Sequence, residues 1–203
     1  MTTSEKLLKT YPIISEQIES DELEVILCEL EKIIAQGLAG DIVEFGCYCG
    51  TTSLFLQRMI QELVPNKKLW VYDSFDGLPE KTKEDQSPIG ELFVRGQLRA
   101  TKSQFIQNFR KAHLTLPSIT KKWFHEVEES ELPDKICFAF LDGDYYISIR
   151  SSLSLVMPRM VKGGIIIIDD YDNPKLPGPQ KAVQDAGIEI GAVKQSLGIY
   201  RVT

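Results

Sequence analysis

The sequence has few of the residues that mark zinc-binding, disulfide-rich or nucleic-acid-binding proteins. Only four of its 203 residues are cysteine and two are histidine, and the cysteines form a C-x-C but no C-x-x-C. We therefore expect reduced thiols and no zinc site. Lysine and arginine number 23 against 29 aspartate and glutamate, a net charge of -6, with no dense basic block. This balance argues against binding to nucleic acid or to an anionic membrane surface.

Long apolar runs are also missing. No run approaches the roughly 20 residues that a membrane-spanning helix needs, and the N-terminal stretch MTTSEKLLKTYP lacks the apolar core of a secretory signal. We therefore expect a cytoplasmic protein that does not enter the membrane. With 43% hydrophobic residues, the chain is long enough for one well-filled core and short for two. A single domain over residues 1–203 is predicted.

The pattern of apolar residues alternates between helix and strand. Ser20 looks like the N-cap of an amphipathic helix within an N-terminal helical segment, residues 1–40. Expected strands then cover 41–46, 68–75, 118–124, 136–142 and 164–171, and expected helices cover 51–63, 103–114, 145–160 and 179–189. Such alternation predicts an α/β fold, a parallel sheet with helices on both faces.

Two other segments depart from this alternation. Residues 192–196 and 198–202 are separated by so little chain that they can pair only as a hairpin, which predicts an antiparallel edge on the sheet. Residues 77–101 contain two prolines and several glycines without a clear period. An irregular segment of that length in a compact domain is usually a lid or binding loop, and we expect a lid here.

Several expected strands end in acidic residues. The run ICFAFL is followed by Asp142 and Asp144, and the run GIIII is followed by Asp169 and Asp170. One helix separates the two runs, which is the length of a single crossover, so the two strand ends should be adjacent. Clustered carboxylates repel one another unless a cation is present, and oxygen ligands favour Mg²⁺, Ca²⁺ or Mn²⁺. The sequence therefore predicts a site for a divalent ion.

The first expected strand leads into a glycine turn. Glu44, Gly46 and Gly50 surround this turn, and Asp73 ends the next strand. A dinucleotide fingerprint G-x-G-x-x-G counted from Gly46 is absent, which argues against a nicotinamide cofactor. Carboxylates suit a ligand with an ammonium group and a ribose diol, because both donate hydrogen bonds. S-adenosylmethionine has both groups.

Other functions fit the acidic strand ends as well. The D-x-D at Asp142 and Asp144 with a later D-D resembles haloacid-dehalogenase-type phosphatases, in which the first aspartate is the nucleophile, and Lys162 is then the candidate lysine. The interval between Asp144 and Asp169 is too short for that fold's intervening strands. A metal-dependent sugar transferase that uses D-G-D is a further alternative, as is a non-catalytic binding module.

Several motifs together resemble the macrocin O-methyltransferase family. They are GDIVEFGCYCGTTS, VYDSFDGLPE, KKWF, LDGDYY, PRMVKGGIIIIDDY and QKAVQD, in order from about residue 40 to 185. The resemblance implies a Rossmann-like class I methyltransferase fold with a mostly parallel seven-stranded sheet. It also implies an enzyme dependent on S-adenosylmethionine and Mg²⁺ that methylates a hydroxyl of a small molecule, such as a sugar of a natural product or a vicinal diol or phenol.

The resemblance also assigns roles to individual residues. The cofactor residues are Glu44, Gly46, Gly50, Thr51, Asp73, Ser74 and Trp123, and the metal ligands are Asp142, Asp169 and Asp170. The chain departs from the family where Cys49 and Thr52 flank a turn that is usually richer in glycine, and where Lys122 replaces a glycine. The family usually has longer termini as well, and because lid and terminal segments shape the acceptor pocket, the acceptor stays open.

The catalytic base is less clearly indicated than the ligands. Asp144 is the first choice because it lies beside the expected metal, followed by Asp142 itself and then by His113 or His125. An aromatic residue, Trp123 or one of the two tyrosines after Asp144, is expected to face the cationic sulfur or the adenine. The amphipathic N-terminal helix is suited to a homodimer contact.

Overall fold

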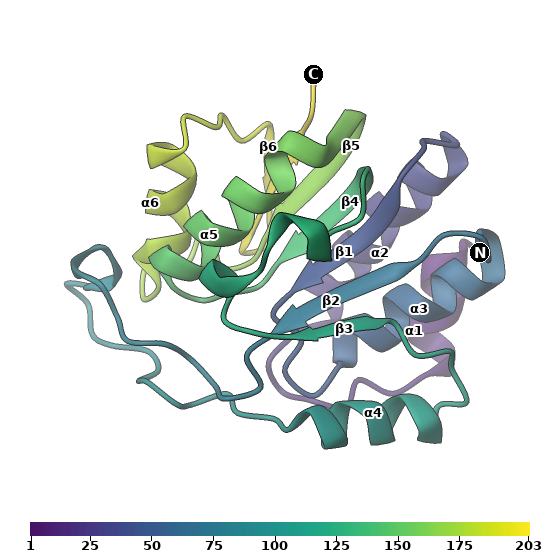
Figure 1. The fold of residues 1–203 in the computed structure, drawn as a ribbon, viewed down its shortest axis with the longest axis horizontal. Helices are drawn as coiled ribbons and strands as arrows, with labels where there is room; N and C mark the ends of the chain where they lie inside the picture. Colours follow the sequence, from purple (N-terminus) through teal and green to yellow (C-terminus); the bar gives the residue numbers. More distant parts are fainter.

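A seven-stranded sheet forms the centre of the computed structural model, which describes residues 1–203 (Figure 1). In spatial order the strands are β3 (Ser118–Lys121), β2 (Leu69–Asp73), β1 (Asp41–Phe45), β4 (Ile136–Leu141), β5 (Met160–Ile168), β7 (Leu197–Arg201) and β6 (Ala192–Lys194). The first five are parallel, and β7 and β6 are antiparallel to their neighbours. This confirms the predicted class I methyltransferase fold with its hairpin edge.

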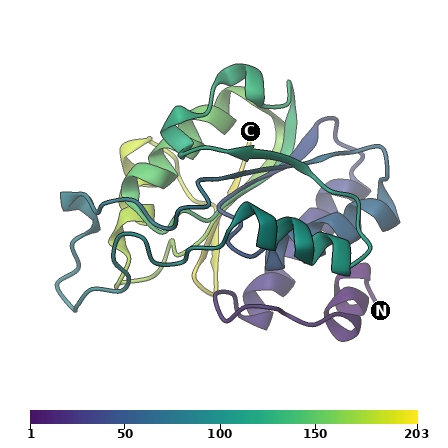
Figure 2. The same ribbon diagram turned by 60° about the horizontal axis from the view of Figure 1, so that its bottom comes forward.

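Helices cover both faces of the sheet. They are α1 (Thr3–Thr10), α2 (Ser20–Ala35), α3 (Thr51–Leu63), α4 (Lys102–Lys111), α5 (Tyr146–Val156) and α6 (Pro177–Asp185). The first four share one apolar core on one face of the sheet, while α5 and α6 share a second core on the other face. Figure 2 shows this layering from below. None of the helices is long and apolar enough to cross a membrane.

The four consecutive isoleucines of β5 are explained by these two cores. Ile165 and Ile167 belong to the core beneath α2 and α3, whereas Ile166 and Ile168 belong to the core beneath α5 and α6. Successive side chains of a strand point to opposite faces, so a strand covered on both sides needs apolar residues throughout. All four side chains are fully buried. The strand therefore holds the residues that follow it in a fixed position.

Several expected boundaries are wrong. Helix α2 begins at Ser20, and its N-cap is Glu19, whose backbone N–H donates to Glu22 at 3.1 Å. The helix expected over 145–160 stops at Val156 and continues as one 3-10 turn (Met157–Arg159), because Pro158 cannot continue the ladder. Strand β5 begins four residues earlier than expected, at Met160, where it pairs with Ile136.

Residues 77–101 form an irregular loop, as predicted, with one 3-10 turn at Lys83–Asp85. The loop extends beyond the end of the sheet, at the left of Figure 1. Its middle is fixed by Asp85, which is 2% exposed. One oxygen of Asp85 accepts the backbone N–H of Tyr146, the first residue of α5, at 2.6 Å, and the other accepts the N–H and hydroxyl of Thr82. The loop is thus attached to the start of a helix.

Candidate active site

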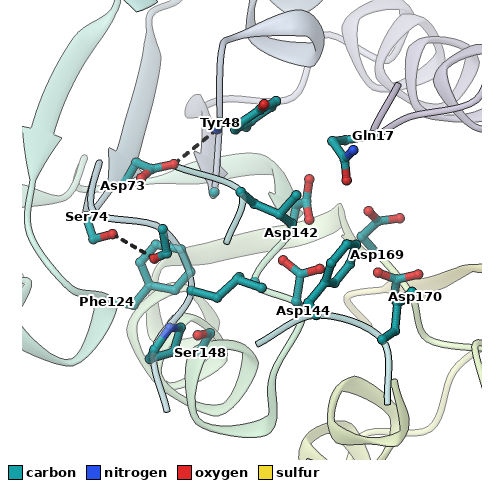
Figure 3. Close-up of a pocket in the computed structure, with 18 of the residues that line it drawn as sticks. Gln17, Tyr48, Asp73, Ser74, Phe124, Asp142, Asp144, Ser148, Asp169 and Asp170 are labelled. Atoms are coloured by element: carbon teal, nitrogen blue, oxygen red, sulfur yellow. Dashed lines mark hydrogen bonds between the residues drawn. The ribbon is translucent and has the colours of Figure 1, made fainter. Parts of the chain in front are cut away.

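One cavity of about 440 Å³ lies at the carboxyl ends of the parallel strands (Figure 3). Its volume is in the range of small-molecule sites in proteins. Four parts of the chain line it: the segment 16–22 between α1 and α2, the ends of β1, β2, β4 and β5, the loop 77–98, and residues 123–125 with the first turns of α5. The cavity therefore occupies the position at which open parallel sheets bind ligands.

Gly46 sets the shape of the cavity floor. Its φ is +88°, and a Cβ at this position would lie 1.7 Å from the carbonyl oxygen of Asp142. The backbone N–H of Asp142 donates to the carbonyl of Phe45 at 2.8 Å, which holds the two strand ends together. Only glycine fits both the conformation and the contact. The turn after β1 can therefore pass directly over the end of β4.

Asp73 fastens the same turn from the other side. One of its carboxylate oxygens accepts the backbone N–H groups of Cys47 at 2.8 Å and Tyr48 at 3.1 Å, and the second accepts that of Phe75 at 2.6 Å. The side chain is half-buried and lines the cavity. A carboxylate oxygen accepts more than one hydrogen bond, so Asp73 retains the capacity to bind a hydroxyl donor in the cavity.

Glu44 does not lie where the sequence suggests. It is 1% exposed, does not line the cavity, and accepts a short hydrogen bond from the hydroxyl of Ser53. Burial, with a smaller contribution from the nearby Asp73, raises the pKa of Glu44 to about 8. Gly50 and Thr51 also lie outside the cavity lining. Glu44, Gly50 and Thr51 lie on the core side of the turn, because the strand and helix that carry them pack into the core.

Four aspartates converge on the cavity, as the crossover length predicts. Leu141 at the end of β4 pairs with Ile168 at the end of β5, and the backbone N–H of Asp169 donates to the carbonyl of Leu141 at 2.9 Å. Asp142, Asp144, Asp169 and Asp170 all line the cavity (Figure 3). Asp144 and Asp169 are each only 8% exposed. Adjacent strand ends therefore bring both pairs of carboxyl groups together.

The aspartates have little to offset their charge. Burial, and then the neighbouring carboxylates, raises the pKa of Asp142 and of Asp169 well above the usual value. The same two causes raise the pKa of Asp144 to about 8. Asp170 accepts a hydrogen bond from the amide of Asn173 at 2.8 Å, whereas no side chain donates to the other three. The cluster is electrostatically incomplete without a cation or a bound donor.

The arrangement of the aspartates and their donor chemistry give different answers about a metal site. No group of three or more histidine, cysteine, aspartate or glutamate side chains is arranged so that it could hold a metal ion. The predicted Mg²⁺ site is therefore not shown. The donor chemistry nevertheless fits such an ion, because Asp142, Asp169 and Asp170 offer oxygen atoms from adjacent strand ends.

The aromatic predictions divide into two groups. Trp123 lines the cavity together with Phe124, His125 and Ser148 on α5. The two tyrosines after Asp144 do not line it. Tyr145 is fully buried against Leu78 and Leu176, and Tyr146 donates its hydroxyl to Asp185 at 3.1 Å. Of the aromatic candidates, only Trp123 is left to face a ligand.

The two histidines also differ in position. His113 is exposed at the end of α4 with a φ of 56°, and it does not line the cavity. His125 is exposed and lines it. The structure therefore removes His113 from the list of candidate bases. Ser74, which was expected at the cofactor, lines the cavity and donates its hydroxyl to the carbonyl of Gly77 at 3.2 Å.

The wall formed by residues 16–22 is not predicted by the sequence. Glu16, Gln17, Glu19 and Glu22 line the cavity from this segment, and Figure 3 shows Gln17 facing the aspartates across it. The only local signal is Ile18, an isolated apolar residue among polar ones, which is 8% exposed and packs into the core. Because the segment reaches the cavity through tertiary packing, neither spacing nor composition locates it.

Known proteins with similar sequences and folds share this arrangement of strands. A family model described as macrocin O-methyltransferase (TylF) matches residues 16–187. The 8-demethyl-8-(2,3-dimethoxy-alpha-L-rhamnosyl)-tetracenomycin-C 4'-O-methyltransferase of Streptomyces olivaceus is 30% identical over 148 residues, 70% of this chain and 57% of that protein. The chain spans only 56% to 60% of the length of the curated relatives that it matches.

Solved structures resemble the fold over most of the chain. The O-methyltransferase NovP superposes with a TM-score of 0.78 at 23% identity, covering 92% of this chain and 81% of that one. The O-methyltransferase from Bacillus cereus in complex with SAH superposes with a TM-score of 0.61 at 13% identity, covering 98% of this chain and 89% of that one. At these identities the likeness concerns the fold.

Proposed function

Because the chain belongs to the macrocin O-methyltransferase family, we propose that it transfers a methyl group from S-adenosylmethionine to a hydroxyl on the sugar of a natural product. The observation that carries this proposal is the single cavity in which a glycine turn, Asp73 and four aspartates meet. The printed name of the Streptomyces olivaceus relative, which describes methylation of a rhamnosyl group, supports the sugar acceptor.

The methyl donor binds over the turn between β1 and α3. Gly46 lets the ligand approach the backbone, and Asp73 and Ser74 line the same part of the cavity. A carboxylate at this position accepts hydrogen bonds from the two ribose hydroxyls. Trp123 and Phe124 provide flat apolar surfaces for the adenine. Glu44 does not contact the donor but positions the start of α3, because it accepts a hydrogen bond from Ser53, the third residue of that helix.

Asp144 is the base that we assign to the reaction. It is buried, points into the cavity with a φ of 56°, and accepts no hydrogen bond from another side chain. Burial, with Asp170 and Asp73 nearby, raises the pKa of Asp144, so its carboxylate is a stronger proton acceptor than an exposed aspartate. As the acceptor oxygen forms its bond to the methyl carbon, the carbon–sulfur bond breaks, the sulfonium becomes a neutral thioether, and the hydroxyl proton passes to Asp144.

A divalent ion is part of the same proposal. Asp142, Asp169 and Asp170 are not grouped around a common centre in this structure, but with their carboxyl groups turned toward one another they would hold Mg²⁺ or a similar oxygen-preferring cation at the adjacent ends of β4 and β5. When bound, such an ion lowers the pKa of a hydroxyl that coordinates it and offsets the repulsion among these carboxylates. The protein contributes the orientation, because β5 is buried on both faces and holds Asp169 in place.

The alternatives from the acidic strand ends are less well supported. A phosphatase of the aspartate-nucleophile type needs a cationic side chain beside the phosphate, and no lysine or arginine lines the cavity. Lys162 lies near the start of β5, and the cavity lies beyond its other end. The same absence of lysine and arginine opposes a transferase that binds a nucleotide diphosphate. If the purified protein binds the cofactor but transfers no methyl group to any acceptor, the alternative of a non-catalytic binding module is favoured.

Calorimetric titration with S-adenosylhomocysteine tests the proposed donor site. We expect saturable binding that Asp73→Asn weakens about tenfold, because the variant loses acceptor capacity toward both the turn and the ribose. Asp76→Asn is the matched control, since Asp76 is exposed and only pairs with Arg99 and Lys121. Absence of binding at millimolar ligand would overturn the methyltransferase proposal. Full activity in excess EDTA would overturn the divalent-ion part alone.

A further inference from the structure

The two ends of the cavity differ in chemistry. One end carries the cluster of four aspartates. The other end is formed by residues 123–125 and the first turns of α5, and it contains no carboxylate, lysine or arginine. Figure 3 shows Phe124 and Ser148 there, away from the aspartate cluster. In the proposed binding mode the sulfonium faces Asp144 and the ribose lies at Asp73, so the adenine occupies this uncharged end.

Gly143 brings the walls of this end close together. A Cβ on Gly143 would lie 2.6 Å from the Cβ of Ser148 and 3.2 Å from a ring carbon of Phe124. Both distances are too short for a larger residue without a shift of its neighbours. Glycine at this position therefore lets the aromatic wall and α5 approach the end of β4 together. Phe124 and the start of α5 border the same small part of the cavity as a result.

Ser148 has a buried hydroxyl without a partner in this part of the cavity. The residue lines the cavity and is 9% exposed, and its hydroxyl forms no hydrogen bond within the protein. The other serines of α5 each donate to a backbone carbonyl one turn earlier: Ser151 to Ile147 at 2.7 Å, Ser152 to Ile149 at 3.0 Å and Ser154 to Ser151 at 2.7 Å. Ser148 does not bond back in this way, although helical serines commonly do. A buried hydroxyl that the fold leaves unpaired indicates a ligand group.

Ser151 offers the opposite hydrogen-bonding character to the same cavity. It lies three residues after Ser148, a spacing that places two side chains side by side on a helix, and it also lines the cavity. Its hydrogen is already donated to the carbonyl of Ile147, so toward a ligand the hydroxyl can only accept. Ser148 still has its hydrogen to donate. The two serines therefore present one donor and one acceptor next to each other.

The adenine base carries the complementary pair of groups. Its ring nitrogen N1 accepts a hydrogen bond and the neighbouring exocyclic amine donates one, whereas hypoxanthine has a hydrogen on N1 and a carbonyl in place of the amine. We propose that Ser148 donates to N1 and Ser151 accepts from the amine, so that this pair of serines selects adenine as the base of the methyl donor. The inference rests on the proposed function and deepens it by naming the residues that select the base.

Calorimetric titration with three ligands tests the pair. They are S-adenosylhomocysteine, its hypoxanthine counterpart S-inosylhomocysteine, and a deaza analogue in which carbon replaces N1. The unmodified protein should bind S-adenosylhomocysteine about tenfold more tightly than either analogue, because each analogue lacks at least one of the two contacts. Equal affinity for all three ligands would overturn the inference.

Single variants assign each contact to one serine. Ser148→Ala should weaken S-adenosylhomocysteine about fivefold and leave the deaza analogue unchanged, because the analogue never made the contact to N1. Ser151→Ala should reduce the preference for S-adenosylhomocysteine over S-inosylhomocysteine from about tenfold to about twofold, since the acceptor that opposes the carbonyl is gone. Alanine is a better helix former than serine, so both variants should keep α5 folded.

Ser154→Ala is the matched control. Ser154 lies on the same helix, is exposed, and does not line the cavity, so its replacement should change none of the three affinities. Unaltered ligand preferences in Ser148→Ala and Ser151→Ala would contradict the assignment of the serines. A protein that binds none of the three ligands would instead contradict the proposed function, so the two failures are distinguishable.

Discussion

Two hollows lie at opposite ends of the same sheet, and they differ in charge as well as in size. The hollow at the amino end of the strands is the larger, about 740 Å³, and it is lined by two acids, Asp41 and Asp134, and two bases, Lys67 and Lys135. The one at the carboxyl end measures about 440 Å³ and is lined by eight carboxylates with a single histidine. Charge is balanced at one end and accumulated at the other.

The hydrogen bonds show the same contrast. At the amino end, Asp41 accepts from the indole of Trp70 and the backbone N–H of Lys68, each at 3.0 Å. Lys67 donates to the carbonyls of Leu38 and Gly40. At the carboxyl end, Asp142 and Asp144 receive nothing from any side chain. A charged group that the fold itself satisfies contributes to stability, whereas one that the fold leaves unsatisfied indicates a ligand.

Replacing one glycine at each end of the sheet should give the largest difference between the two hollows. Gly46→Ala places a methyl group 1.7 Å from the carbonyl oxygen of Asp142 at a φ of +88°, so we expect a loss of about 3 kcal/mol or more in unfolding free energy and no cofactor binding. Gly37→Ala, with φ +65° and no atom within 4 Å, should cost about 1 kcal/mol. Urea unfolding measures both. Equal losses would show that the floor is not tightly packed.

Matched aspartates at the two ends sharpen the contrast between function and stability. Asp142→Asn should reduce methyl transfer about 100-fold or more while the apo protein becomes more stable, since one repelling carboxylate is removed. Asp41→Asn should leave transfer unchanged and lower the unfolding free energy by about 1 kcal/mol, because it weakens two hydrogen bonds. Turnover assays and thermal unfolding read the two effects. A drop in stability for both variants would contradict the contrast.

The pH dependence of stability gives the smallest effect. The pKa of Glu44 is raised to about 8 in the folded protein, so folding favours its protonated form. The stabilisation is complete below pH 4.5 and is lost as pH rises toward 8. Glu44→Gln keeps an acceptor for Ser53 and should make the loss between pH 5 and pH 8 smaller by on the order of 2 kcal/mol. Glu24→Gln is the exposed control. An unchanged pH profile would mean that Glu44 is ionised in its buried position.

Much of the fold follows from local sequence patterns. Helix α3 is predicted residue for residue because Gly50 precedes a regular apolar period, and β5 is recognised by isoleucines that only a strand covered on both faces needs. The adjacent acids at 142 and 169 follow from the crossover length. These features depend on neighbours in sequence or on simple topology, which is why the sequence alone is sufficient for them.

What escapes prediction depends on contacts between distant segments. The sequence predicts Glu44 as a cofactor ligand because it precedes Gly46. Strand alternation instead points its side chain into the core, where it accepts a hydrogen bond from Ser53. Tyr145 and Tyr146 follow Asp144 directly, yet the start of α5 directs both away from the cavity. The segment 16–22 is held at the cavity by Ile18, which packs into the core, and by the 2.9 Å hydrogen bond between the hydroxyls of Ser15 and Thr51. No local pattern encodes which segment will cover an open end of the sheet.

The contacts of Asp85 determine how the loop 77–101 is joined to the rest of the protein. This buried carboxylate accepts the first N–H of α5 and lies against Gly178 at the start of α6. Asp85 therefore attaches the loop 77–101 to the first turns of both helices. The part of the loop before Asp85 contacts the same helices, because Leu78 packs on Tyr145 in an apolar cluster. The part after it is joined to the same place, because Phe93 and Leu98 pack on that cluster and Leu78 exchanges backbone hydrogen bonds of 2.9 Å with Gly96 and Gln97. Contacts on both sides of Asp85 therefore make the loop a wall of the cavity that is continuous with the start of α5.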